Sequence, residues 1–135
     1  MCNEMRKEHT KIPREGMAWK LFRLRGRRNY CQCFNSACPY ISADNVWIDW
    51  LERVTDKIYK RESGFCAFRT RKEARRAKRD LEEYYFLYYR ENPSWCPRIV
   101  LKKIAYQRGL GQHKEDNMLN KEVYETIIVK RFKIV

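Results

Sequence analysis

Six cysteines are the first candidates for chemistry in this chain of 135 residues, because thiolates bind metals and act as nucleophiles. Cys31, Cys33 and Cys38 lie close together in the sequence, and alternation along a strand would place the first two on one face. Further zinc ligands are available at Cys66, Cys96, His9 and His113. The spacing matches no familiar zinc knuckle, and free cysteines are also common in protein cores. We therefore predict core packing and no cofactor, with Cys31, Cys33, Cys38 and Cys66 as the candidate set if zinc is bound.

A thiol beside an imidazole would also suit covalent catalysis. Cys66 with His113 or His9, and Glu125 as the carboxylate, would form such a centre in an enzyme that acts on an anionic or nucleotide substrate. None of these residues has the sequence context of a known nucleophile motif. The glycines at 109 and 111 lack the lysine and hydroxyl of a P-loop. We predict a binding protein and not an enzyme, with the enzyme as the alternative.

Arginines form the second kind of chemical group. Arg23, Arg25, Arg27 and Arg28 surround Gly26, at the expected tip of a hairpin. A guanidinium group presents a planar fork of donors that binds phosphate or guanine with two hydrogen bonds. The alternative is that these charges only keep an exposed turn soluble. We predict that the hairpin tip binds nucleic acid or an acidic partner.

A second basic group occupies the first half of a predicted helix that begins at Arg71. Its members are Arg71, Lys72, Arg75, Arg76, Lys78 and Arg79. Acidic residues four positions later predict the ion pairs Arg76–Asp80, Lys78–Glu82 and Arg79–Glu83. A solvated helix face is the simpler interpretation, and a phosphate-binding face is the functional one. We expect the arginines of the hairpin and of the helix to converge on a single surface.

The net charge indicates the class of partner. Thirty Lys and Arg residues against 17 Asp and Glu residues give a net charge of +13, which attracts polyanions. We predict nucleic acid or a host nucleoprotein as partner, with an adaptor for acidic proteins or a homodimer as alternatives. No apolar run approaches the length of a membrane span, and the N-terminus lacks the apolar segment of a secretory signal. These features predict a cytoplasmic protein without a membrane partner.

The elements that position these groups begin after a flexible basic arm, which we place at residues 1–15 because it is polar and contains Pro13. Residues 16–135 are predicted to form a single domain. In its first part we expect strands at 17–24 and 29–34, a loop at 35–42, and a helix from about 44 to 60.

The second part is organised around residues 63–90. A short buried strand at 65–68 is followed by Thr70, which with Glu73 has the spacing of a capping box. The expected core stripe of the helix is Ala74, Ala77, Leu81, Tyr84, Tyr85 and Tyr88. Next come a strand at 99–106, a polar loop at 107–120, and a closing strand at 122–135 that pairs antiparallel with 99–106. The predicted fold is α+β, a small antiparallel or mixed sheet of about five strands with two helices packed on one face.

Three short runs carry a resemblance to a class of proteins. They are Met17-Ala-Trp19-Lys-Leu-Phe22-Arg, Gly64-Phe-Cys-Ala-Phe68-Arg-Thr70 and Ile99-Val-Leu-Lys. Together they resemble small uncharacterised phage and prophage proteins of α+β fold, and the most specific part is the G-F-x-A-F-x-T motif before the helix. The cysteine cluster and the basic helix depart from that pattern. The resemblance implies a viral accessory protein that binds a host nucleic-acid machine, as anti-CRISPR proteins and other inhibitors of bacterial defence do.

Overall fold

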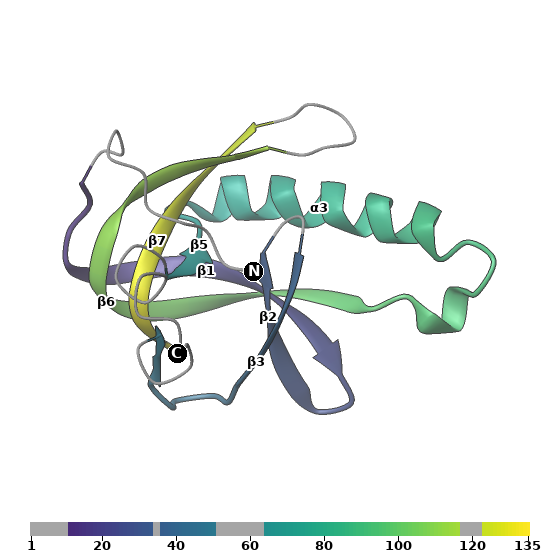
Figure 1. Ribbon diagram of the computed structural model, residues 1–135, viewed down its shortest axis with the longest axis horizontal. Helices are drawn as coiled ribbons and strands as arrows, with labels where there is room; N and C mark the ends of the chain where they lie inside the picture. Colours follow the sequence, from purple (N-terminus) through teal and green to yellow (C-terminus); the bar gives the residue numbers. More distant parts are fainter. Residues whose placement is uncertain (1–10, 34–35, 51–63, 117–122) are drawn as a thin grey trace.

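The computed structural model describes residues 11–33, 36–50, 64–116 and 123–135. At 33, 36–41 and 113–116 only the backbone is described. A strongly curved sheet wraps around an inner core, and the long helix of the described residues lies across its outer face (Figure 1).

Seven strands form this sheet, in the order β3-β2-β1-β6-β7-β4, and β5 also pairs with β7. The strands are β1 (Glu15–Arg25), β2 (Arg28–Cys33), β3 (Ser36–Ser42), β4 (Ile48–Asp49), β5 (Phe65–Ala67), β6 (Arg98–Asp116) and β7 (Val123–Ile134). All strand pairs are antiparallel. The α+β class and the pairing of the closing strand with β6 are therefore confirmed, whereas the sheet has more strands than predicted.

One bridge closes part of the sheet on itself. Directly after β5, Phe68 exchanges two backbone hydrogen bonds with Trp19 of β1, with N to O distances of 2.7 and 2.8 Å. Because β1 pairs with β6, β6 with β7 and β7 with β5, this bridge completes a circuit of hydrogen bonds around the core.

Alternation along β1 separates two cores. Phe22 faces the inside of the curved sheet, where it packs in one cluster with Phe65 and Phe132. Leu21 faces outward and belongs to a second cluster beneath the helix. Lys20 is fully buried on the inner side, where its Nζ lies 2.6 Å from the Cys66 carbonyl oxygen and over the rings of Phe22 and Phe132.

The helix α3 (Arg71–Tyr88) covers the outer cluster. Thr70 caps it as predicted, since its hydroxyl accepts a hydrogen bond from the Glu73 amide at 3.2 Å. The stripe of Ala74, Ala77 and Leu81 is buried, as the spacing predicted. The prediction that Tyr88 packs in the core is wrong. Tyr88 is 67% exposed, because the last turn of the helix extends past the sheet.

The second predicted helix is wrong in its first part. Within 44–49, Asn45 adopts a positive φ of 59° and Ile48–Asp49 forms β4, which pairs with β7. The Asn45 amide also donates to the Ile134 carbonyl at 2.9 Å, so in 44–49 contacts with the last strand override the predicted helix. Most of the remaining range to residue 60 lies outside the described residues.

Two predicted loops are also strands. Residues 36–42 form β3 at the edge of the sheet, a position that tolerates Pro39. The range 107–116 continues β6, with a register shift between Gly109 and Gly111. A side chain at Gly109 would place its Cβ 2.5 Å from the Pro13 carbonyl oxygen, so this glycine permits close contact between two backbone segments.

The predicted arm is partly ordered structure. Ile12 is 8% exposed, the Pro13 carbonyl accepts a hydrogen bond from the Tyr106 hydroxyl at 3.2 Å, and Glu15 begins β1. Residues 11–15 therefore pack against β6, and 1–10 lie outside the described residues.

Lys130 provides a stability prediction. It lies in β7 and is 6% exposed, and burial lowers its pKa from 10.5 to about 8, although the charge of Asp49 raises it. This lowering corresponds to about 3 kcal/mol of differential stabilisation. At pH 7 the folded protein must hold a charge that burial disfavours, so we expect Lys130→Met to raise the free energy of unfolding by up to about 3 kcal/mol.

The sign of the pH dependence follows from the same shift. Between pH 8 and 10.5 the unfolded chain binds more protons at Lys130 than the folded protein does, so stability rises with pH in this window. The free energies of unfolding of the wild type and of Lys130→Met, measured with urea, should therefore differ by about half as much at pH 9.5 as at pH 7. Parallel curves for the two proteins would contradict the prediction.

Candidate nucleic-acid interface

The tip of the first hairpin presents three exposed arginines. Arg25 and Arg28 are cross-strand partners at the ends of β1 and β2, and Arg27 lies in the turn beside Gly26, whose φ is +59°. None of the three makes an ion pair with any residue that the structure describes. The predicted hairpin is thus confirmed, with its positive charges open to solvent.

Arg23 lies deeper, on the face of β1 that is turned toward the helix. Its guanidinium carbon stands 5.3 Å from the ring centroid of its cross-strand partner Tyr30. Its Nε is buried and has no hydrogen-bond partner among the described residues. An unsatisfied donor on a cation costs free energy, and such groups are found where a ligand or water completes the bonding.

Aromatic side chains face these arginines from the end of α3 and the turn after it. Ring centroids of successive pairs among Tyr84, Tyr85, Tyr88 and Tyr89 lie 4.9–6.0 Å apart. The chain then forms the short 3₁₀ helix η1 (Pro93–Trp95), in which the Trp95 amide donates to Asn92 at 3.0 Å. Trp95 is 70% exposed, although hydrogen bonds fix its backbone.

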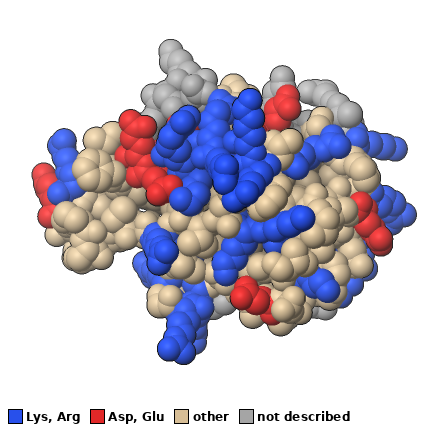
Figure 2. Space-filling model, turned by 180° about the vertical axis from the view of Figure 1, so that it is seen from behind, with Lys and Arg blue, Asp and Glu red and all other residues tan. Residues whose placement is uncertain are grey.

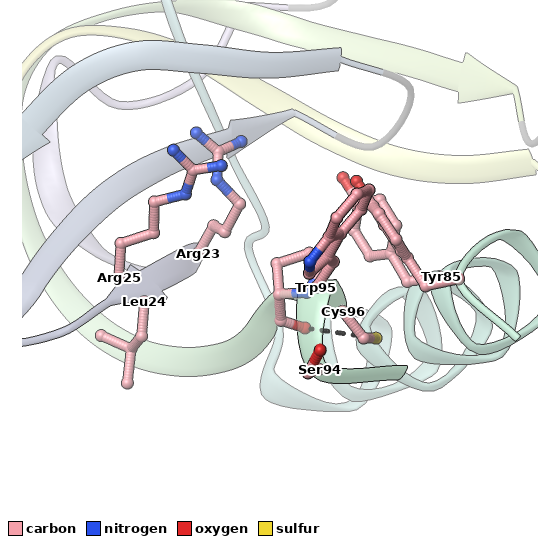
Figure 3. Close-up of a pocket in the computed structure, with 9 residues that line it drawn as sticks. Arg23, Leu24, Arg25, Tyr85, Ser94, Trp95 and Cys96 are labelled. Carbon is pink, nitrogen blue, oxygen red and sulfur yellow. Dashed lines mark hydrogen bonds between the residues drawn. The ribbon is translucent and has the colours of Figure 1, made fainter. Parts of the chain in front are cut away.

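Together these elements enclose a cleft of about 500 Å³, which we call the arginine–aromatic cleft. Its lining residues are Arg23, Leu24, Arg25, Tyr85, Tyr89, Ser94, Trp95, Cys96 and Pro97. Figure 3 shows Arg23 and Arg25 on one side of the cleft and Trp95 and Tyr85 on the other, with Leu24 pointing away. No Asp or Glu is among these nine residues, so the part of the lining that the structure describes carries only positive charge.

Tyr85 remains a neutral phenol at physiological pH. Burial raises its pKa above the usual 10, while a hydrogen bond with Gln32 and the charge of Arg23 act in the opposite direction. A neutral tyrosine presents a hydrogen-bonding hydroxyl without repelling an anion.

The basic half of α3 differs from the hairpin because much of its charge is already paired. Arg76 forms a salt bridge with Glu73 at 2.6 Å, and Lys78 pairs with Glu82 at 2.7 Å as predicted. The predicted Arg76–Asp80 pair is wrong, since Asp80 accepts a hydrogen bond from the Tyr124 hydroxyl. Arg79 lies 3.9 Å from Asp80 and does not pair with Glu83 in the described part of the chain.

Three further cations of this half remain available on its surface. Lys72 and Arg75 are exposed and make no ion pair with a described residue, and the Arg71 guanidinium stacks 5.3 Å from the centroid of Trp19. Figure 2 shows a dense group of Lys and Arg side chains in the upper middle of the view, with acidic side chains directly beside it.

The two predicted basic groups do not form one patch around a common centre. The hairpin arginines lie against the aromatic end of α3, whereas the basic half begins beside Trp19. Arg75, in the middle of the basic half, lies ten helical residues before Tyr85, about 15 Å along the axis, and Arg79 lies six residues before it, about 9 Å. The arginines are therefore arranged in two groups along the helix.

A smaller hollow of about 310 Å³ lies at the basic end of α3, between the helix and β7. Here Arg76 donates to Glu73 and, at 2.5 Å, to the Val123 carbonyl. Burial raises the pKa of Glu73. Hydrogen bonds from Arg76 and the Glu125 amide, together with the charges of Arg76 and Lys72, lower it by more, so its net pKa is below 4.5. The charges in this hollow are paired with one another, and the hydrogen bonds of Arg76 and Glu73 join the helix to β7.

The cysteine predictions fall partly on residues that are not described. Cys31 and Cys66 are buried in the inner core, and the side chains of Cys33 and Cys38 lie outside the described part. Among the described residues no group of three or more His, Cys, Asp or Glu is placed to hold a metal.

The predicted catalytic set is also divided. Cys66 pairs with Ile128 and is buried, whereas Glu125 is exposed three positions earlier on β7, so alternation turns these side chains to opposite faces. His9 and the side chain of His113 lie outside the described residues.

Sequence reasoning missed the aromatic side of the cleft. The sequence pattern places Tyr84, Tyr85 and Tyr88 in a core stripe, and gives Trp95 no role. The density of aromatic residues from 84 to 95 was the available signal, because a helix that is aromatic on several faces cannot bury them all.

Comparison of this chain with protein-family models, with curated proteins and with solved structures finds no match. No helix in the described ranges combines the length and apolar character that a membrane span requires.

Proposed function

We propose that this protein is a non-enzymatic nucleic-acid-binding protein that holds phosphates with the arginines of its first hairpin. The observation that carries the proposal is the arginine–aromatic cleft, in which Arg23 has a buried Nε without a partner in the described structure and the described lining residues include no carboxylate. Positive charge extends from the cleft to the hairpin tip through Arg25, Arg27 and Arg28. None of the three makes an ion pair with a described residue.

The charge distribution favours a polymeric anion over a small one. A small anion would be satisfied by one or two guanidinium groups, whereas the tip places Arg25, Arg27 and Arg28 in succession beyond Arg23. Lys72 and Arg75 extend the positive field along α3. The net charge of +13 attracts the same partner at long range.

The partner is nucleic acid, either alone or within a host nucleoprotein in the cytoplasm. The resemblance of the G-F-x-A-F-x-T segment to small phage proteins supports a role in blocking a host nucleic-acid machine, such as a defence complex. The cleft would contact phosphates in the same way on free nucleic acid and on nucleic acid within a nucleoprotein.

Binding measured across a salt series tests the proposal. Each phosphate contact releases counterions and contributes a slope of about −0.7 to −0.9 to the plot of log affinity against log salt. With three or four arginine–phosphate contacts, affinity for a labelled 30-nucleotide strand should fall about 20- to 150-fold between 50 and 200 mM salt. Fluorescence anisotropy gives this slope directly, and absence of binding to DNA and RNA at 50 mM salt would refute the proposal.

An adaptor for acidic proteins is the second candidate, and one observation favours it. Phe86, Leu87 and Tyr88 are 71%, 55% and 67% exposed at the end of α3, and exposed apolar groups mark protein interfaces. In that case an acidic peptide would compete with nucleic acid for the protein, and Phe86→Ala would weaken the peptide complex without changing nucleic-acid affinity.

A further inference from the structure

We infer that the arginine–aromatic cleft receives an unpaired base, so that the nucleic acid bound is single-stranded. This inference rests on the proposed function and specifies its ligand. It follows from three features of the cleft: its aromatic wall, its shape, and the position of Arg23, whose Nε is buried.

The aromatic wall has the properties of a stacking platform. Trp95 is 70% exposed, and Tyr85 and Tyr89 line the cleft beside it with ring centroids 6.0 Å apart. Every nucleobase has two π-faces, and stacking on aromatic side chains is the main sequence-independent contact to single strands. The backbone at Trp95 is fixed by the turn of η1, in which the Cys96 amide donates to Pro93 at 3.1 Å, so little ordering is required on binding.

The shape of the cleft excludes a base that remains in a duplex. About 500 Å³ of space lies between the side chains of β1 and those of α3 and η1, and Arg23 lies inside it, with its Nε below the surface. Bases of a duplex present only their edges, so they cannot enter far enough to stack on Tyr85 or Trp95. An unpaired base can enter with its face against the rings and its edge toward Arg23, while the arginines of the tip hold the flanking phosphates.

A base and a phosphate are present in both single-stranded DNA and RNA, and the cleft chemistry applies to both. The test therefore uses four probes of the same length: dT12, rU12, a 12-nucleotide abasic DNA strand, and a 12-base-pair duplex. The abasic strand keeps the phosphates and removes the bases. We expect dT12 or rU12 to bind about 5- to 150-fold more tightly than the abasic strand, which is the range for stacking one base.

Variants assign this gain to the cleft. Trp95→Ala should remove most of the difference between dT12 and the abasic strand, and Trp95→Phe, which keeps a ring, should restore part of it. Phe86→Ala is the matched control, because Phe86 is equally exposed at 71% on α3 but does not line the cleft. Quenching of tryptophan fluorescence by dT12 should also be lost in Trp95→Phe.

The outcomes separate this inference from the proposed function. Equal binding of all four probes, with a strong salt dependence, would overturn the single-strand inference and leave phosphate binding intact. Equal loss of dT12 affinity in Trp95→Ala and Phe86→Ala would also overturn it. Binding of none of the probes at low salt would refute both.

Discussion

The double replacement Arg25→Gln and Arg28→Gln is expected to lower the affinity for a single strand about 25- to 60-fold at 0.1 M salt. Both arginines lie at the tip of the hairpin, where they are exposed and make no ion pair with a described residue. Loss of two phosphate contacts should also reduce the salt slope by about 1.4 to 1.8. A filter-binding or anisotropy series from 50 to 300 mM salt measures both quantities.

A matched control separates contact from net charge. Lys11→Gln with Arg14→Gln removes the same charge from exposed residues at the opposite end of β1, about 30 Å from the hairpin tip along the strand. We expect this variant to keep the salt slope of the wild type and most of its affinity. If the two double variants weaken binding equally, the hairpin is not a discrete contact and the effect is one of total charge.

Replacement of Phe65 by alanine is expected to destabilise the protein by about 3–5 kcal/mol. Phe65 is fully buried, and its ring packs edge-to-face on Trp50 and Phe132 at centroid distances of 5.1 and 4.9 Å. It also belongs to β5, which joins β7 to the bridge between Phe68 and Trp19. The variant therefore leaves a cavity at the point where the circuit of strands closes.

Urea unfolding measures this loss, and two further variants make it interpretable. Phe65→Leu should lose about 1–2 kcal/mol, so it remains measurable if the alanine variant does not fold. Phe86→Ala removes an exposed ring and should change stability by less than about 0.5 kcal/mol. A loss below about 1 kcal/mol in Phe65→Ala would show that this aromatic cluster does not hold the inner core together.

Local sequence signals were sufficient for the elements that depend on local contacts. The hairpin at Gly26, the cap at Thr70 and the buried stripe from Ala74 to Leu81 are each set by residues within a few positions of one another. The same signals placed the hairpin arginines correctly at an exposed tip.

Other parts of the fold depend on distant contacts that no local pattern contains. Gly109 predicted a loop. In the structure a glycine is required there because β6 passes close to Pro13, nearly a hundred positions earlier in the chain, and leaves no room for a side chain. Ile48 lies in a helical pattern and yet pairs with Phe132 of the last strand. In each case a tertiary contact outweighs local propensity.

The candidate site was half predicted for the same reason. The positive side of the cleft comes from a hairpin that sequence can locate, whereas the aromatic side approaches it only because α3 runs along β1 from Trp19 toward Arg23. This alignment brings Tyr85 to Arg23 and keeps the basic half of the helix away from the hairpin. The convergence of all arginines on a single surface was therefore an expectation that the helix direction does not support.

The proline in the outermost strand affects whether copies of this protein can associate edge to edge. Pro39 lies within β3, at the end of the strand order, and it has no amide hydrogen to donate. An uninterrupted free edge would be a template on which another chain could add a strand and begin to aggregate. Molecules gathered side by side along one polyanion would be especially exposed to this hazard, and the missing donor in β3 interrupts such a ladder without changing the surface charge.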